Sequence, residues 1–234
     1  MKHIKLFETT SAYNNWLNSD NYITPYIVKD KEQDKVFYQK KILLPYDSEI
    51  EYLEATGTQH INTNLICSGE YRFKIKFMCN SLRSPEDGNS ASIFGSRTSA
   101  TIKDYQLSTF KNGCFGYYGL HTNLGINSLN TEYIVEFIED KLFINNDKRL
   151  NNLNTSFTTS SPLFLFALYQ SSNNNICEHF IGRIYYFKIY DENNNIILDM
   201  IPVRKNGIGY MFDKVTNQLF ENSGTSNFIL GLDK

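Results

Sequence analysis

The sequence lacks a strong charge of either sign and contains few cysteines. Its 234 residues carry a net charge of −2, so no electrostatic signal predicts binding to nucleic acid or to an anionic membrane surface. The 4 cysteines are widely spaced and form no CxxC pair. This spacing indicates neither a zinc site nor a dense disulfide scaffold. We therefore expect no metal ion and no cofactor.

Long hydrophobic runs are also missing. The N-terminal stretch MKHIKLFETT has no extended apolar segment of the kind that a signal peptide requires, and no stretch reaches transmembrane length. We expect neither an export signal nor membrane insertion, and we expect the chain to fold in a cytoplasm.

Catalytic motifs are absent as well. The chain contains no GxSxG elbow, no HExxH pair, no P-loop and no GxGxxG between a strand and a helix. Its 4 histidines are scattered, and none has a neighbouring acid or cysteine at metal-ligand spacing. The motif content predicts no catalytic residue.

One group of acids partly resembles a glycosidase pattern. In TEYIVEFIED, Glu132 and Glu136 share one face of a predicted strand. Some jelly-roll glycoside hydrolases carry Glu-x-Asp-x-Glu, but Ile134 stands at the middle position here. Glu139 falls on the opposite face and Asp140 on the turn. The pattern favours a solvated acidic face over a catalytic pair.

Aromatic residues are abundant: 16 Tyr and 17 Phe against 1 Trp. Tyr and Phe favour strands, and short strand patterns recur along the chain. The segment 71–79 alternates apolar and basic residues, 131–150 and 182–203 are typical of hairpins, and SPLFLFALYQ (161–170) is typical of a central strand. We predict a mostly β fold of two packed antiparallel sheets, a β-sandwich.

The first 45 residues differ from the rest and predict a small α+β module (1–45), followed by the sandwich (46–234). Tyr13, Trp16 and Leu17 have the i, i+3, i+4 spacing of one apolar helical face. A hairpin pattern, YITPYIVKD and KVFYQK, follows before Pro45. Tyr13, Trp16 and Leu17 are candidates for docking or assembly, although Trp16 is more simply explained as an anchor that packs the helix.

Two stretches resemble a known family. IEYLEATGTQHINTNL (50–65) and PVRKNGIGYMFDKVTNQLFENSGTSNFILG (202–231) resemble the opening and closing signatures of concanavalin A-like, laminin G-type jelly-roll domains of bacterial and bacteriophage proteins. The resemblance covers roughly 50–232 and implies a jelly roll. In such a fold the turns ATGT (55–58) and NSGTSN (222–227) are expected to lie close together, and Asn206-Gly207 is a hairpin signal.

The lead-in MKHIKLFE also resembles, more weakly, one found in Bacteroides proteins and their crAss-like phages, although KVFYQK departs from that pattern. Together the resemblances imply a non-enzymatic virion protein, a head-fibre or tail-fibre component assembled in the host cytoplasm. Its expected partners are other virion proteins, sister chains in a homo-oligomer (a trimer is favoured) and a host-surface glycan. The alternatives are a bacterial lectin-like carbohydrate-binding module and, less favoured, a glycoside hydrolase.

The segment GYYGLHTN (116–123) is the local candidate for glycan contact. Glycan-binding loops combine aromatic platforms with polar side chains, and this segment brings such residues together: Tyr117, Tyr118, His121 and Asn123. Alternating core and surface tyrosines would give the same pattern, so both interpretations stay open.

Overall fold

The structure is a computed structural model that describes residues 23–30, 35–41, 44–86, 88–99, 105–110, 113–117, 121–123, 126, 128–138, 140–150 and 156–234. By its internal contacts the chain divides into two units, Met1–Pro45 and Tyr46–Lys234. In the first unit, β1 (Ile23–Asp30) pairs antiparallel with β2 (Lys35–Lys41). The predicted helix with Tyr13, Trp16 and Leu17 lies outside the described residues.

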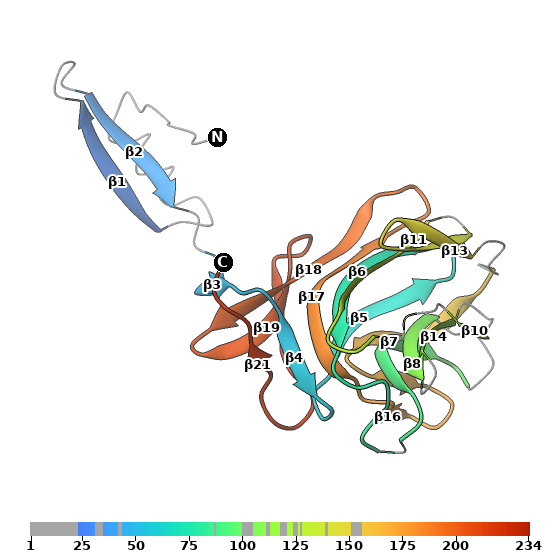
Figure 1. Cartoon of the computed structure of the whole chain (residues 1–234). Coiled ribbons are helices and arrows are strands. Elements are labelled where there is room, and N and C mark those ends of the chain that lie inside the picture. Colours follow the sequence, from blue (N-terminus) through green and yellow to red (C-terminus); the bar gives the residue numbers. More distant parts are fainter. Residues whose placement is uncertain are drawn as a thin grey trace. The chain divides into compact units, whose positions relative to one another are not determined.

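The second unit is built from two sheets that face each other (Figure 1). Among the described residues, the larger sheet has eleven strands, in the order β13-β12-β11-β6-β17-β18-β19-β20, with β3, β4 and β21 paired alongside. Their bounds are β3 (Ser48–Glu49), β4 (Leu53–Thr56), β6 (Arg72–Cys79), β11 (Glu132–Ile138), β12 (Lys141–Ile144), β13 (Asp147–Leu150), β17 (Ile181–Tyr190), β18 (Ile196–Lys205), β19 (Ile208–Asp213), β20 (Gln218–Phe220) and β21 (Ile229–Leu230).

The smaller sheet has eight strands among the described residues, in the order β10-β9-β8-β7-β14-β5, with β15 and β16 attached through β7. Pairing is antiparallel except between β15 and β7, which run parallel. The bounds are β5 (Ile61–Ser68), β7 (Ala91–Arg97), β8 (Tyr105–Phe110), β9 (Gly113–Tyr117), β10 (His121–Asn123), β14 (Thr158–Leu165), β15 (Leu168–Gln170) and β16 (Asn175–Cys177). The described residues contain no helix, so the predicted β-sandwich is confirmed.

The core fills the space between the two sheets, as the alternating patterns predict. On β6, Phe73, Ile75 and Phe77 are buried, while the lysines between them are half-exposed. Phe73 packs edge-on against Phe94 of the smaller sheet, with ring centroids 4.9 Å apart, and Phe94 lies 5.0 Å from Phe187 of β17. β6 therefore presents one face to the core and the other outward. β18 and β19 bury residues on both faces, because Ile201, Val203 and Phe212 form a second buried cluster with Tyr46.

The two ends of the second unit meet, which confirms the expected proximity of the ATGT and NSGTSN turns. The Thr58 hydroxyl donates to the Thr225 carbonyl at 2.8 Å, and the Thr225 amide donates back to the Thr58 carbonyl. β21 also pairs with β4. At the predicted hairpin, Asn206 and Gly207 both have positive φ, 52° and 78°, the geometry of a type I′ turn.

One strand prediction was wrong. SPLFLFALYQ does not form a single strand, because the chain reverses at Phe166: β14 runs antiparallel to β7 and β15 runs parallel to it. Phe166 has a φ of 62°, which is unusual for a bulky residue. Its fully buried ring packs 4.8 Å from the ring of Phe228, and its amide donates to the Ile93 carbonyl. Core packing thus stabilises a turn that the apolar pattern does not reveal.

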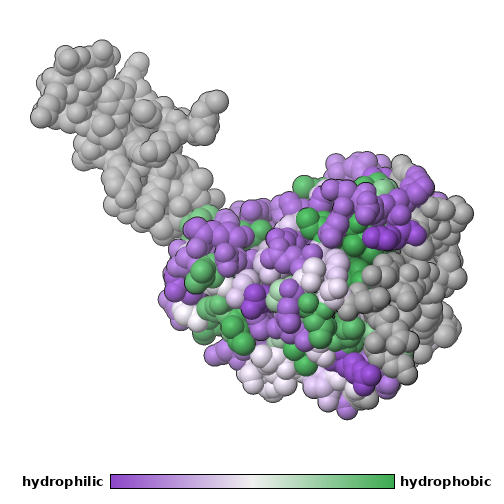
Figure 2. Space-filling model, in the orientation of Figure 1, coloured by the Kyte–Doolittle hydropathy of each residue, from purple (hydrophilic) through white to green (hydrophobic). Residues whose placement is uncertain are grey.

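The surface of the second unit mixes polar and apolar groups. On the face visible in Figure 2, apolar residues form small patches separated by hydrophilic ones. The described residues include no helix long and apolar enough to cross a membrane.

Candidate functional site

A β-bulge in β17 places two adjacent tyrosines on the outer face of the larger sheet. In the pairing with β6, Ile184 is opposite Phe77 and Tyr186 is opposite Lys76, so Tyr185 is the extra residue. Adjacent strand residues ordinarily point to opposite faces. Here the bulge breaks the alternation, and Tyr185 and Tyr186 are both half-buried and both line one pocket. Bulges of this kind often re-aim side chains at functional sites.

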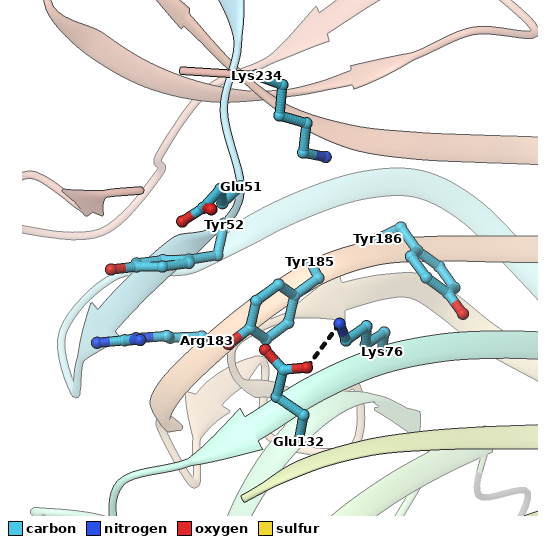
Figure 3. Close-up of a pocket in the computed structure, with 8 residues that line it drawn as sticks. All are labelled: Glu51, Tyr52, Lys76, Glu132, Arg183, Tyr185, Tyr186 and Lys234. Carbon is cyan, nitrogen blue, oxygen red and sulfur yellow. Dashed lines mark ion pairs between the residues drawn. The ribbon is translucent and has the colours of Figure 1, made fainter. Parts of the chain in front are cut away.

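The pocket has a volume of about 410 Å³ and mixes tyrosines with charged residues (Figure 3). Its floor comes from β17, β6 and β11, and its wall from the segment that leads into β4 and from the last residue of the chain. The lining residues are Glu51, Tyr52, Lys76, Glu132, Arg183, Tyr185, Tyr186 and Lys234.

The aromatic side of the pocket is held in place by stacking contacts. The rings of Tyr52 and Tyr185 lie edge-to-face with centroids 5.6 Å apart. The guanidinium of Arg183 lies over the Tyr52 ring at 4.1 Å, and the Lys76 ammonium lies 4.6 Å from the Tyr185 ring centroid. Cation–π contacts of this kind restrain both partners. The tyrosines therefore form a preorganised platform.

Ion pairs satisfy the cations of the pocket. The Lys76 ammonium lies 2.6 Å from a Glu132 carboxylate oxygen, and Arg183 pairs with Glu54. The hydrogen bond from Lys76 lowers the pKa of Glu132, so this carboxylate is ionised at neutral pH. Burial, together with the hydrogen bond to Glu132, raises the pKa of Tyr185 to about 12, which keeps the phenol protonated. Arg183, Lys76 and Tyr185 can donate hydrogen bonds, and Glu132 can accept them.

A second, smaller pocket lies further along the same strands. It has a volume of about 180 Å³, and its polar lining consists of Arg72, Glu136, Tyr190 and Asn194. Arg72 donates to the Asn194 side chain, and Glu136 pairs with Lys74 at 3.1 Å. This pocket also lies on the outer face of the larger sheet, because Arg72 and Lys74 alternate with the buried residues of β6.

The acids singled out in the sequence, Glu132 and Glu136, lie on this outer face. The predicted shared face is confirmed, with Ile134 between them on the same strand. Each carboxylate pairs with a lysine of the neighbouring strand β6. The predicted solvated acidic face is in fact a ladder of ion pairs between two strands.

The segment predicted to contact glycan belongs to the other sheet. Tyr117 ends β9, and His121 and Asn123 are in β10; His121 is in register with Tyr117, and Asn123 with Phe115. Tyr118 lies outside the described residues, as do Trp16, Tyr13 and Leu17. The structure describes only the backbone of Tyr117, His121 and Asn123, so their role stays a prediction.

Sequence reasoning missed the residues of the larger pocket. The adjacent tyrosines in RIYYFKIY carry the signal, since two large aromatics in a row cannot both alternate into the core. The sequence does not show that a bulge turns both outward. Tyr52 and Arg183 are 131 positions apart in the chain and meet only because β4 pairs with β17.

Part of the outer face of the smaller sheet, over β7 and β8, is covered by a segment of the chain. Gln106 and Ser92 are fully buried and donate to the Glu178 carboxylate at 3.0 and 2.9 Å, and Glu178 also pairs with Arg97 at 3.1 Å. Glu178 belongs to the segment after β16, which packs over this face. Among the described residues, no group of three or more His, Cys, Asp or Glu side chains could hold a metal ion.

A hydrogen-bonded chain of two histidines and a glutamate lies at the same covered side. Glu86 accepts from the Glu178 amide at 3.1 Å and pairs with His179, whose Nε2 lies 3.3 Å from Nδ1 of His60. Burial, and next the neighbouring His179, lower the pKa of His60 to about 4. The buried ring is therefore neutral at pH 7.

No protein-family model and no curated protein matches the sequence. Among solved structures, a candidate carbohydrate-binding protein from Bacteroides ovatus has a similar fold, with a TM-score of 0.55 and 10% identity over 88% of this chain. The match covers 66% of that protein. At this identity the likeness supports the fold alone. The chain is thus a two-sheet β-sandwich protein with an open pocket of tyrosines and ion-paired side chains on the outer face of its larger sheet.

Proposed function

We propose that this protein is a non-enzymatic carbohydrate-binding β-sandwich and that sugar binds in the larger pocket, against Tyr52, Arg183 and Tyr185. The observation that carries the proposal is the bulge of β17, which presents two adjacent tyrosines on an exposed sheet face. A sugar ring offers an apolar face for an aromatic platform and hydroxyl groups for charged hydrogen-bonding partners. The pocket supplies both kinds of contact.

Two further points support this function. The structural neighbour from Bacteroides ovatus is described as a candidate carbohydrate-binding protein. In addition, both candidate acids of β11 already pair with lysines, whereas a retaining or inverting glycosidase needs one protonated acid and one free carboxylate beside the scissile bond.

The biological setting that we propose is a phage particle, with 1–45 attached to the particle or to sister chains and 46–234 displayed outward in a trimer. This part rests on the sequence resemblances alone. Copurification of the chain with intact particles, in multiples of three copies, tests it independently of sugar binding. Recovery only from uninfected bacterial cells would favour the bacterial lectin-like alternative.

Binding of the full chain to a glycan array, followed by titration calorimetry on the best ligand, tests the proposed site. We expect Tyr185→Ala to weaken binding about fivefold or more, since an aromatic contact contributes about 1 kcal/mol or more. Arg183→Ala should act in the same direction.

Tyr117→Ala and His121→Ala are the matched controls, because they alter the competing segment on the other sheet. The site is overturned if these variants abolish binding while Tyr185→Ala leaves it intact. The function itself is overturned if the folded full chain binds no glycan on the array.

A further inference from the structure

We propose that the two pockets are the ends of one groove that holds consecutive units of a linear, uncharged glycan. This inference rests on the proposed function and deepens it, because it names the class of ligand. A lectin that captures one terminal sugar needs a single pocket. Here the outer face of the larger sheet has two, and the same three strands, β6, β11 and β17, line both.

The residues between the pockets form a continuous row. Along β6, the outward residues Lys76, Lys74 and Arg72 lead from the larger pocket to the smaller one. Along β17 the row runs from Arg183 to Tyr190. With one residue taken up by the bulge, this row is about 20 Å long at the usual strand rise. A groove of this length spans several sugar rings.

Aromatic side chains occur along the whole row. Tyr185 and Tyr186 line the larger pocket, Tyr190 lines the smaller one, and all three are half-buried. Platforms at both ends of a groove suit a polymer that contacts the protein at several rings. A single-sugar site would leave Tyr190 without a role in binding.

Four cations along the row are paired with carboxylates, which favours an uncharged ligand. Arg72, at the far end, donates instead to the Asn194 side chain. Lys76 pairs with Glu132 and Lys74 with Glu136, while Arg183 pairs with Glu54 and Lys188 with Asp199 at 3.1 Å. A sulfated or uronic acid chain would place its anionic groups beside these carboxylates. At these four cations an anionic group would bind by separating pairs that are already formed, whereas hydroxyl groups can hydrogen-bond to the pairs without doing so.

The test is titration calorimetry of the full chain with oligosaccharide ladders of one to six units. The neutral probes are cello-, laminari- and manno-oligosaccharides, and the charged probe is an oligogalacturonide ladder. We expect the affinity for at least one neutral series to rise with length up to about four units, as a groove about 20 Å long predicts. The oligogalacturonides should bind more weakly at every length.

Variants at the far end of the groove sharpen the test. Tyr190→Ala should weaken binding of the longest neutral ligand about five- to tenfold and leave binding of the disaccharide unchanged. Arg72→Ala should act in the same direction. The control is Tyr169→Ala, a half-buried tyrosine on a strand of the smaller sheet, which should alter neither affinity.

The possible failures are distinguishable. An affinity that does not depend on length, or a Tyr190→Ala effect equal for short and long ligands, overturns the groove and leaves a single-sugar site in place. Tighter binding of oligogalacturonides overturns the uncharged ligand. Failure of the folded chain to bind any ladder or any array glycan overturns the proposed function and this inference with it.

Discussion

The two outer faces of the sandwich use polar side chains in opposite ways. On the larger sheet, Lys76 and Glu132 pair in the open, with Glu132 about half exposed (49%). On the smaller sheet, Arg97 and Glu178 pair at 3.1 Å and are only 13% and 12% exposed. The same type of ion pair thus lines an accessible pocket on the larger sheet. On the smaller sheet it holds the segment after β16 against β7. We expect ligand binding on the outer face of the larger sheet, because its polar groups are accessible and can exchange their present partners for groups of a ligand.

The largest effect on stability is expected from the covered face of the smaller sheet. Glu178→Ala removes a carboxylate that accepts from Gln106 and Ser92 and pairs with Arg97. Because it leaves a cation and two buried donors without their partner, we expect the free energy of unfolding to fall by about 3–5 kcal/mol. Urea denaturation monitored by fluorescence measures this loss.

Glu132→Ala is the matched control on the open face. It also breaks a glutamate–cation pair, but solvent reaches both groups, so we expect a loss below about 1 kcal/mol. Equal losses of unfolding free energy for Glu178→Ala and Glu132→Ala would contradict the difference between the two faces. Glu178→Gln, which keeps the side-chain volume and one oxygen acceptor, should lie between them.

Acid should lower the free energy of unfolding through His60, which lies on the covered side of the smaller sheet. The pKa of His60 is lowered from 6.5 to about 4 by burial and by His179, with Glu86 acting in the opposite direction. Between these two values the unfolded chain binds the proton more readily than the folded chain. Stability is therefore full above pH 6.5 and falls as the pH drops toward 4, by an amount on the order of 3 kcal/mol.

Urea denaturation at pH 7, 6, 5 and 4 follows this loss, and His60→Gln should flatten the profile because glutamine does not titrate. If the variant and the wild type lose stability in parallel, His60 is not the group responsible. The loss would then be assigned to other titrating groups, and the chain from Glu86 through His179 to His60 would have no special part in closing this face.

The sequence predicts the parts of the fold that depend on local pattern. The alternation in 71–79 identifies the core face of β6, and the ATGT and NSGTSN turns predict how the ends of the sandwich meet. These succeed because side-chain period and turn chemistry are properties of a few consecutive residues.

The sequence does not predict features that depend on tertiary packing. The apolar run that contains Phe166 gives no sign of the reversal, which the fully buried Phe166 ring and its packing against Phe228 stabilise. In the same way, the adjacent residues Tyr185 and Tyr186 show that the strand alternation is broken, but they do not show that a bulge turns both outward. The site was missed because its platform depends on this register shift and on a contact between Tyr52 and Arg183.

The smallest expected effect is on the outer face of the larger sheet. It is the contribution of the Lys76–Glu132 ion pair to the stability of the fold. In a double-mutant cycle of Lys76→Ala and Glu132→Ala, we expect a coupling energy of about 0.5 kcal/mol, the usual size for an exposed pair. The coupling should almost vanish in 1 M salt, where the screening length is about 3 Å. The Arg97–Glu178 cycle should retain most of its larger coupling under the same conditions. If the Lys76–Glu132 coupling proves as large and as insensitive to salt, the pair belongs to the scaffold, and its carboxylate is not free to exchange its lysine for a ligand hydroxyl.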